Sequence, residues 1–162
     1  MFPIYGHLVG LDEVQIGLLF SLSSLVDMAL FYPAGQIMDN RGRKWTAVPG
    51  TAILSLSMLA LPLLPSLTGI IIFAILSGIG NGITTGVLLT IGSDIAPDVE
   101  RGQFLAAWRL QLDAGQTAAP LVVGALSEVA TLATATYCVF ALGLGGALVF
   151  SLLMRETLNK DA

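Results

Sequence analysis

The chain has 162 residues, of which 55% are hydrophobic and only 11% are charged, and its formal net charge is −4. Soluble domains carry about a quarter charged residues, so this composition and a mean hydropathy of +0.84 indicate a membrane protein. One cysteine and one histidine are too few for a disulfide framework or for a zinc site of cysteine and histidine ligands.

Five apolar segments of spanning length follow one another along the chain. About 20 helical residues cross the roughly 30 Å hydrocarbon core, and backbone groups in lipid must be satisfied internally, so runs of this length are expected to be helices. A turn at residues 62–69 divides the uncharged stretch 45–93. We expect an all-α polytopic helical bundle with spans at residues 14–38, 45–64, 67–92, 103–127 and 131–154.

Basic residues fall on one side of this expected bundle. Three lie in the loop 39–44, one in the loop 93–102 and two in the tail 155–162, while the seventh, Arg109, is inside a span. Because basic loops remain in the cytoplasm, we expect a multi-pass protein of the cell membrane with its amino terminus outside and its carboxyl terminus cytoplasmic. Residues 2–14 look like the outer end of a helix and a loop, as though a preceding span were missing.

Polar side chains inside the expected spans are candidates for a substrate or coupling site. A charge at mid-bilayer costs roughly 2.5–3.5 kcal/mol on insertion scales, so it needs a partner or a wet cavity. Arg109 and Asp113 are four residues apart on one helix face, where they can pair. Such a pair either serves function or only neutralises both charges for insertion. Asn81 either bonds to a neighbouring helix or faces a cavity, and Gln111 and Gln116 are further polar residues of the fourth span.

Asp27 is the best candidate for proton coupling. It has no ionisable partner in its own expected helix. Burial favours the neutral form of a carboxyl group, which is the condition that a proton-coupling site needs. The alternative is a hydrogen bond between helices without a role in transport.

Small residues predict close packing or bending in two of the spans. Glycine recurs every four residues in the third span, a ridge that lets another helix backbone approach closely, at Gly78, Gly82 and Gly86. Glycine and proline also interrupt the outer half of the fourth span, at Gly115, Pro120 and Gly124. Proline removes a backbone donor and bends a helix, so the fourth span is either a gating element or a helix with a static kink.

The most specific pattern in the chain follows the first span. Residues 35–44 read GQIMDNRGRK, and we call this segment the loop motif; its characteristic residues are Gly35, Asp39, Arg41, Gly42, Arg43 and Lys44. It resembles the loop signature of the major facilitator superfamily, G-x-x-x-D-[RK]-x-G-R-[RK]. Asn40 departs from that signature, which usually has a basic residue there, and is similar to the degenerate copy in the second half of the family fold.

Weaker similarities agree with this placement. Gly78-Ile-Gly-Asn81-Gly82 resembles the family's fourth-helix pattern R-x-x-Q-G with glycine in place of arginine, as in its tenth-helix counterpart. The fourth span loosely resembles the antiporter pattern G-x-x-x-G-P-x-x-G-G. Residues 155–158 are similar to the ending after the last helix, although similar tails also follow the sixth. The resemblance therefore favours helices 8 to 12 over a position in the first half.

The resemblance implies a secondary active transporter of small molecules in which two six-helix halves rock against each other. It implies as partners a small-molecule substrate, protons as the candidate coupling ion, the lipid bilayer and a missing amino-terminal half. In the family the loop aspartate latches one state of the transporter, which gives Asp39 and the loop motif that role here. We also predict an ion pair between Arg43 and Asp94.

Other classes of function receive less support from the sequence. Signatures of soluble enzymes, such as GxSxG, HExxH, Walker and CxxC motifs, are missing from the sequence, so we expect no catalytic activity, cofactor or metal, and no nucleic-acid partner. Two alternatives remain: a non-transporting sensor or assembly protein on a transporter-derived scaffold, and a half-transporter that assembles with another half. Charge alone leaves drugs, sugars and organic acids open as substrates.

Overall fold

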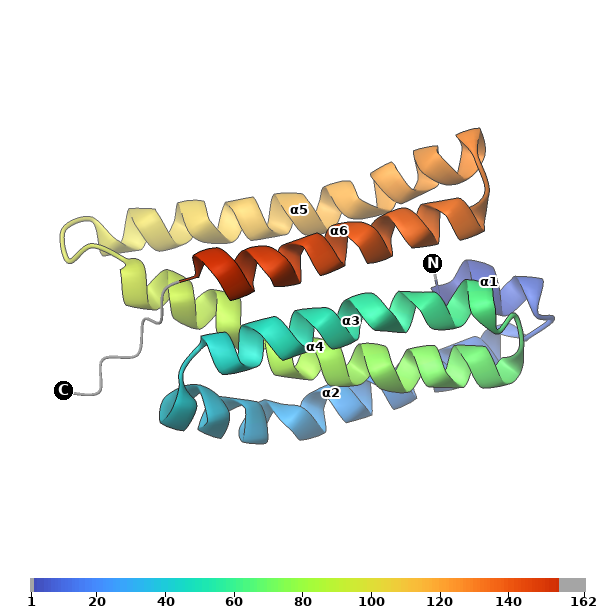
Figure 1. Cartoon of the computed structure of the whole chain (residues 1–162), viewed down its shortest axis with the longest axis horizontal. Coiled ribbons are helices and arrows are strands. Elements are labelled where there is room, and N and C mark those ends of the chain that lie inside the picture. The colour runs from blue at the N-terminus through green and yellow to red at the C-terminus, as the bar shows by residue number, and fades with distance from the viewer. Residues whose placement is uncertain (1, 155–162) are drawn as a thin grey trace.

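The structure is a computed structural model that describes residues 2–154 (Figure 1). Within that range it contains six helices and no strand, which confirms the predicted all-α helical bundle. Residues 155–162 lie outside the described residues. The predicted cytoplasmic tail and the similarity of residues 155–158 to the ending after the family's last helix both fall there. The helices are α1 (Phe2–Leu8), α2 (Glu13–Arg41), α3 (Lys44–Leu63), α4 (Leu67–Ile95), α5 (Arg101–Val129) and α6 (Leu132–Leu153).

Polar caps set the start of the three helices that begin at the end of the bundle away from the loop motif. Asp12 accepts a hydrogen bond from the backbone N–H of Gln15 at 2.7 Å, and the Gln15 side chain accepts one from the Asp12 N–H, which forms a capping box at the start of α2. Ser66 and Thr131 cap α4 and α6 with a side-chain oxygen alone, which accepts from the N–H of Gly69 and of Thr134. These caps satisfy N–H groups that a helix cannot satisfy itself.

Two connections are shorter than the sequence predicted. The loop expected at residues 39–44 is reduced to residues 42–43, because α2 continues to Arg41 and α3 begins at Lys44. The loop expected at residues 93–102 is reduced to 96–100. Charged residues marked the limits of the apolar runs, but a helix that leaves the hydrocarbon core continues while its backbone hydrogen bonds remain favourable.

Four of the described helices, α2, α3, α4 and α6, are long and apolar enough to cross a membrane. The helix α5 has 29 residues, which is long enough, but its apolar character is reduced by the charges and amides of its first half. The fifth span therefore stays a prediction. A helix that is polar on one side can span a membrane only if that side faces protein or water.

The helices pack in a sequence that differs from their order in the chain. The pairs with extensive contact are α2 with α4, α4 with α3, and α3 with α6, while α5 contacts α6 and, more sparsely, α4. Figure 1 shows this order across the bundle, with α2 and α5 at opposite edges. The helix α4 is thus central, and α5 is the least embedded of the long helices.

The glycine ridge of α4 brings α2 close, as its spacing predicted. A Cβ added at Gly78 would lie 2.5 Å from the backbone oxygen of Ser23, and one at Gly82 would lie 2.6 Å from the backbone oxygen of Asp27. At Gly86 the neighbour is only the flexible tip of Met38, at 3.3 Å. The ridge therefore sets the position of Asp27 against α4.

Candidate functional site

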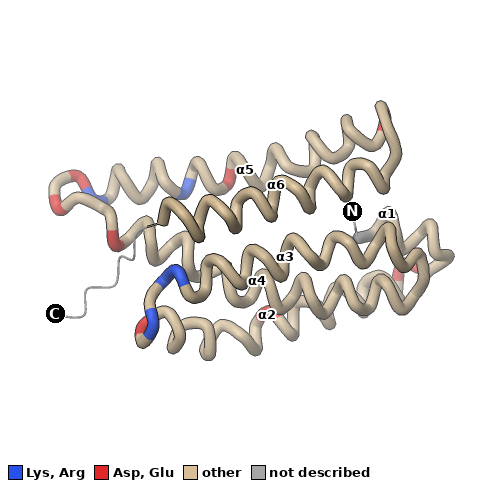
Figure 2. The backbone as a smooth tube through the Cα atoms, viewed as in Figure 1, with Lys and Arg blue, Asp and Glu red and all other residues tan. Residues whose placement is uncertain are grey.

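Charged residues gather at the end of the bundle where α2 meets α3 and where α4 meets α5 (Figure 2). We call this the charged end; its described basic residues are Arg41, Arg43, Lys44 and Arg101. Arg109, inside α5, is the remaining basic residue among those described. No group of three or more potential metal ligands occurs among residues 2–154.

Arg43 joins three helices at the charged end. Its Nε lies 3.0 Å from Oδ2 of Asp94 near the end of α4, and its Nη1 donates a 2.9 Å hydrogen bond to the backbone oxygen of Met38 in α2. The ion pair predicted from the sequence is therefore confirmed. The Arg43 side chain is only 12% exposed, so these contacts are made largely out of water.

The other residues of the loop motif differ in exposure, from the exposed Asp39 and Arg41 to the buried Gly42. Asp39 lies 3.8 Å from Nη1 of Arg43, but its side chain is 78% exposed. Gly42 has a φ of 107°, a conformation that residues with a side chain rarely adopt, and this explains the glycine between the two helices. Apart from its own helix backbone and chain neighbours, no described atom lies within 4 Å of a Cβ added at Gly35. Arg41 is exposed at the end of α2.

A groove of about 570 Å³ lies between α4 and α5, and we call it the polar groove. Asn81 from α4 and Arg109, Asp113 and Gln116 from α5 line it. The structure thus brings together three of the four residues predicted for substrate or coupling. Its remaining walls are apolar or carry hydroxyls, from Leu54, Thr84, Thr85, Leu88, Leu89, Leu112, Gly115 and Ala119.

The possible pairing of Arg109 with Asp113 is not found. No ion pair within 4.0 Å joins them in the described part of the chain, and both residues are exposed where they line the polar groove. The order of the two residues contributes to this result, because the basic Arg109 comes before the acidic Asp113. On a helix, an acidic residue four positions before a basic one pairs better than the reverse order. Both charged groups are therefore available to a third molecule.

Asp27 lies in a second groove of about 280 Å³, which we call the serine groove. Ser23, Ser24, Ser77 and Asn81 contribute its polar lining. Oδ1 of Asp27 is buried and has no hydrogen-bond partner among residues 2–154. Asn81 lines both grooves, so it lies between Asp27 and the charged residues of α5.

Several residues of the site were not found by sequence reasoning. Ser23 and Ser77 place their Oγ atoms 3.3 Å apart across α2 and α4. Serines also bond to their own helix backbone, as Ser77 does to the oxygen of Ala74, and therefore attract little attention in a sequence. The available signal was the position of Ser77 four residues before Asn81, on the same helix face.

Trp108 was also missed, although it attaches α5 to α4. Its Nε1 donates a 2.9 Å hydrogen bond to the backbone oxygen of Leu88. A Cβ at Gly92 would lie 2.5 Å from the same nitrogen, so this glycine makes room for the indole. Arg101 adds hydrogen bonds to the side chain and backbone of Ser93, at 2.8 and 3.1 Å. The helix α5 is thus held to α4 at the charged end.

The residues predicted for gating lie further along α5. The helix runs without interruption through Pro120. A Cβ added at Gly115 or Gly124 would meet no atom within 4 Å. Close packing at these two glycines is therefore not seen within the described chain, and gating by this part of α5 stays a prediction.

The fold and the grooves together define a polytopic helical membrane protein with an open polar groove between its helices. The family model of the Major Facilitator Superfamily matches residues 1–161, and the chain belongs to this family. It is 25% identical over 159 residues to an uncharacterized MFS-type transporter of Methanocaldococcus jannaschii. That match covers 98% of this chain and 41% of the relative, so the chain spans about two fifths of the length of this relative.

We predict that Arg43 and Asp94 stabilise the bundle as a coupled pair. Arg43→Gln and Asp94→Asn should each lower the free energy of unfolding by about 1–3 kcal/mol, because each removes the 3.0 Å ion pair of a partly buried charge. A double-mutant cycle, measured by reversible unfolding in mixed detergent micelles, should give a coupling energy above about 1 kcal/mol.

Arg41→Gln is the matched control. Arg41 lies two residues before Arg43 and is exposed, so this substitution removes the same charge without breaking the ion pair. It should change the free energy of unfolding by less than about 0.5 kcal/mol. A coupling energy near zero, or a loss at Arg41 equal to the loss at Arg43, would contradict the assignment.

Proposed function

We propose that this chain forms one half of a secondary active transporter for small molecules, working by alternating access. The observation that carries the proposal is the polar groove, in which a guanidinium, a carboxylate and two amides line a space of about 570 Å³ between membrane helices. Membership in the Major Facilitator Superfamily and similarity to an MFS-type transporter support transport at the level of the superfamily. The function proposed is transport and not catalysis.

The lining of the polar groove favours a small polar substrate. Arg109 offers a planar donor to an anionic group, and Asp113 can accept from a cationic or hydroxyl group. Asn81 and Gln116 can both donate and accept. Because neither charge is paired with the other, water must solvate them in the empty groove, and a substrate can replace that water when it binds.

A second helical half is the proposed cover for the polar groove. The walls that the described helices provide leave its charged residues exposed, and charges of this kind cannot face lipid. We propose the amino-terminal half of the same transporter as the cover, either in one longer polypeptide or as a separate chain. Rocking of the two halves would open the groove to each side in turn.

The loop motif has a proposed role in this motion. Arg43 is committed to Asp94 and to the end of α2, but Asp39 exposes 78% of its side chain at the same end of the bundle. An exposed carboxylate of this kind can attract the positive amino-terminal end of a helix in the other half. We propose that this contact latches one state and that the charged end faces the cytoplasm.

Asp27 is proposed as the coupling residue. Its Oδ1 is buried and has no hydrogen-bond partner among the described residues, so this oxygen can take a proton without breaking an existing contact. Asn81 lies between Asp27 and the polar groove, so a change at Asp27 can reach the substrate through one side chain. Loading and release of a proton at Asp27 would then accompany transport.

Substitutions in the polar groove test the proposed function. The chain and its other half, reconstituted in proteoliposomes on a solid-supported membrane, should give saturable currents with one class among organic acids, sugars, amino acids and organic cations. Arg109→Gln and Asp113→Asn should each reduce the apparent affinity about tenfold or more, the effect of losing roughly 1.4 kcal/mol of binding free energy.

Glu128→Gln serves as the control, because Glu128 is an exposed carboxylate of α5 that does not line the groove. It should leave the apparent affinity within about twofold, as expected for a surface substitution. Absence of a current with all four classes, or an equal effect of Glu128→Gln, would overturn the proposal.

A separate prediction concerns coupling. Asp27→Asn should abolish accumulation driven by a pH gradient, because the amide cannot exchange a proton, while substrate exchange without a gradient continues. Radiolabelled uptake into proteoliposomes measures both activities. Asp98→Asn, in the exposed α4–α5 connection, should retain both. Proton-driven accumulation that survives in Asp27→Asn would remove Asp27 from the coupling mechanism.

A further inference from the structure

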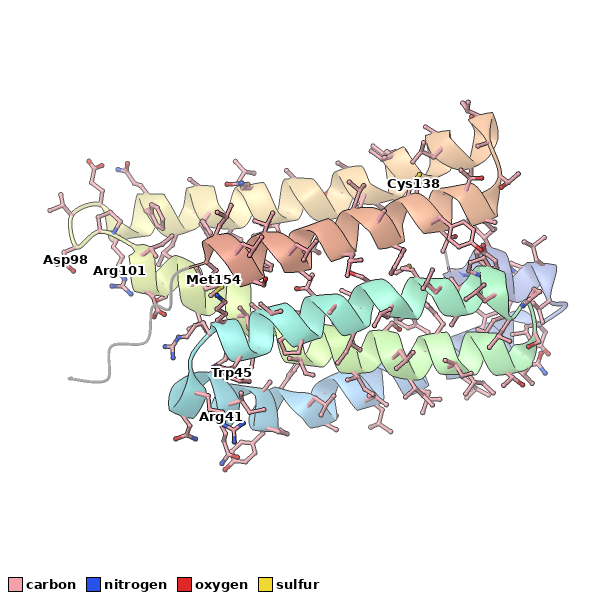
Figure 3. The ribbon with its side chains drawn as sticks, in the orientation of Figure 1. Arg41, Trp45, Asp98, Arg101, Cys138 and Met154 are labelled. Carbon is pink, nitrogen blue, oxygen red and sulfur yellow. The ribbon has the colours of Figure 1, made fainter. Side chains whose placement is uncertain are left out.

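A third groove lies between α2 and α4, and we call it the apolar groove. Its volume is about 250 Å³. The α2 wall is formed by Phe31, Ala34 and Met38, and α4 contributes two glycines together with Thr85 and Leu89. The groove begins about one helical turn from Arg41, which Figure 3 labels at the end of α2.

The lining of this groove suits a hydrocarbon chain. None of the residues that line it is charged. Thr85 is the one polar side chain among them, and its hydroxyl already donates a 2.8 Å hydrogen bond to the backbone oxygen of Asn81. Phe31 and Leu89 are each 47% exposed, so apolar surface is open to an incoming ligand. Covering that surface would be favourable in itself.

The apolar groove adjoins the polar groove. Thr85 and Leu89 of α4 line both grooves, and they are spaced i, i+4, which places them on one face of the helix. The polar groove carries the charged side chains of Arg109 and Asp113, which cannot face lipid. A molecule bound in the polar groove can therefore extend past Leu89 into the apolar groove.

Arg109 is the charged residue that lies level with the shared wall. Trp108 donates its 2.9 Å hydrogen bond to the backbone oxygen of Leu88, which places this part of α5 beside Leu88 and Leu89. Arg109 follows Trp108 directly, whereas Asp113 lies about 6 Å further along α5. An anionic group bound at Arg109 therefore has Leu89, and beyond it the apolar groove, next to it.

We propose that the substrate is an amphiphilic organic anion, with a carboxylate or sulfonate group at Arg109 and an apolar chain in the apolar groove between Phe31 and Leu89. This inference rests on the proposed transport function and names its substrate class. The guanidinium of Arg109 donates to two oxygens of the anion. The chain covers Phe31 and Leu89, which adds affinity that a short acid does not gain.

A homologous series measures the contribution of the apolar groove. Ethanesulfonate, butanesulfonate, hexanesulfonate and octanesulfonate carry the same permanent negative charge and differ only in chain length. The chain and its other half are reconstituted in proteoliposomes, and currents on a solid-supported membrane give the apparent affinity for each sulfonate. We expect the affinity to rise about fourfold with each added methylene, equivalent to about 0.8 kcal/mol, up to the length that fills the groove.

Substitutions then locate the chain. Phe31→Ala should lower the ratio of the octanesulfonate affinity to the ethanesulfonate affinity about fivefold, because part of the apolar wall is lost. Tyr32→Ala is the matched control, since it removes an exposed aromatic side chain outside the groove, and it should keep this ratio within about twofold. Arg109→Gln should weaken binding of all four sulfonates by a similar factor and retain the ratio. The ratio does not depend on the amount of folded protein.

The outcomes separate this inference from the proposed function. Transport of the sulfonates with an affinity that does not rise along the series would overturn the amphiphilic substrate and leave transport intact; a lipid acyl chain in the apolar groove would give this result. Equal effects of Phe31→Ala and Tyr32→Ala on the ratio would overturn the placement of the chain. Higher affinities for a matched alkylammonium series would overturn the anionic group. Absence of a current with these and all other substrate classes would overturn the proposed function itself.

Discussion

Arg43 Nε lies 3.0 Å from Asp94 Oδ2, and this ion pair, together with the hydrogen bond from Arg43 to the backbone oxygen of Met38, joins the ends of α2 and α4 to the start of α3. Among the described helices, α3 and α2 make the most extensive contacts, and both make them with α4. Because the arginine side chain is almost fully covered, a change in the relative position of any of the three helices must break or stretch a contact that water does not easily replace. The arrangement at the charged end therefore constrains the grooves further along the same helices.

The distribution of polar groups along the bundle follows from that arrangement. The glycine ridge of α4 holds α2 close enough for Asp27 and Ser77 to line one groove, while Trp108 holds α5 against α4 beside the other. Asn81 is on the wall of both. The proposed substrate path and the proposed coupling residue thus share the side chain of Asn81.

The sequence predicted the helical bundle and the Arg43–Asp94 pair because both depend on strong local signals: long apolar runs and a specific loop motif. It also predicted the close packing at Gly78 and Gly82, since a four-residue glycine spacing has few other uses in a membrane helix. The sequence could not decide whether Arg109 and Asp113 form an ion pair, because a spacing of four residues permits a pair without requiring one. The serines opposite Asp27 and the indole of Trp108 depend on which helices become neighbours, and the order of packing is not contained in any single segment.

Transport by alternating access requires that the polar groove open to the two sides of the membrane in turn. Gln116, which lines it, can be replaced by cysteine in a Cys138→Ser background, since Cys138 is the single native cysteine. The rate of reaction with a membrane-impermeant thiol reagent is then measured from each side, in vesicles of opposite orientation that contain both halves. Alternating access predicts that position 116 reacts from both sides and that a transported substrate changes the two rates in opposite directions. Reaction from one side only, unaffected by substrate, would contradict it.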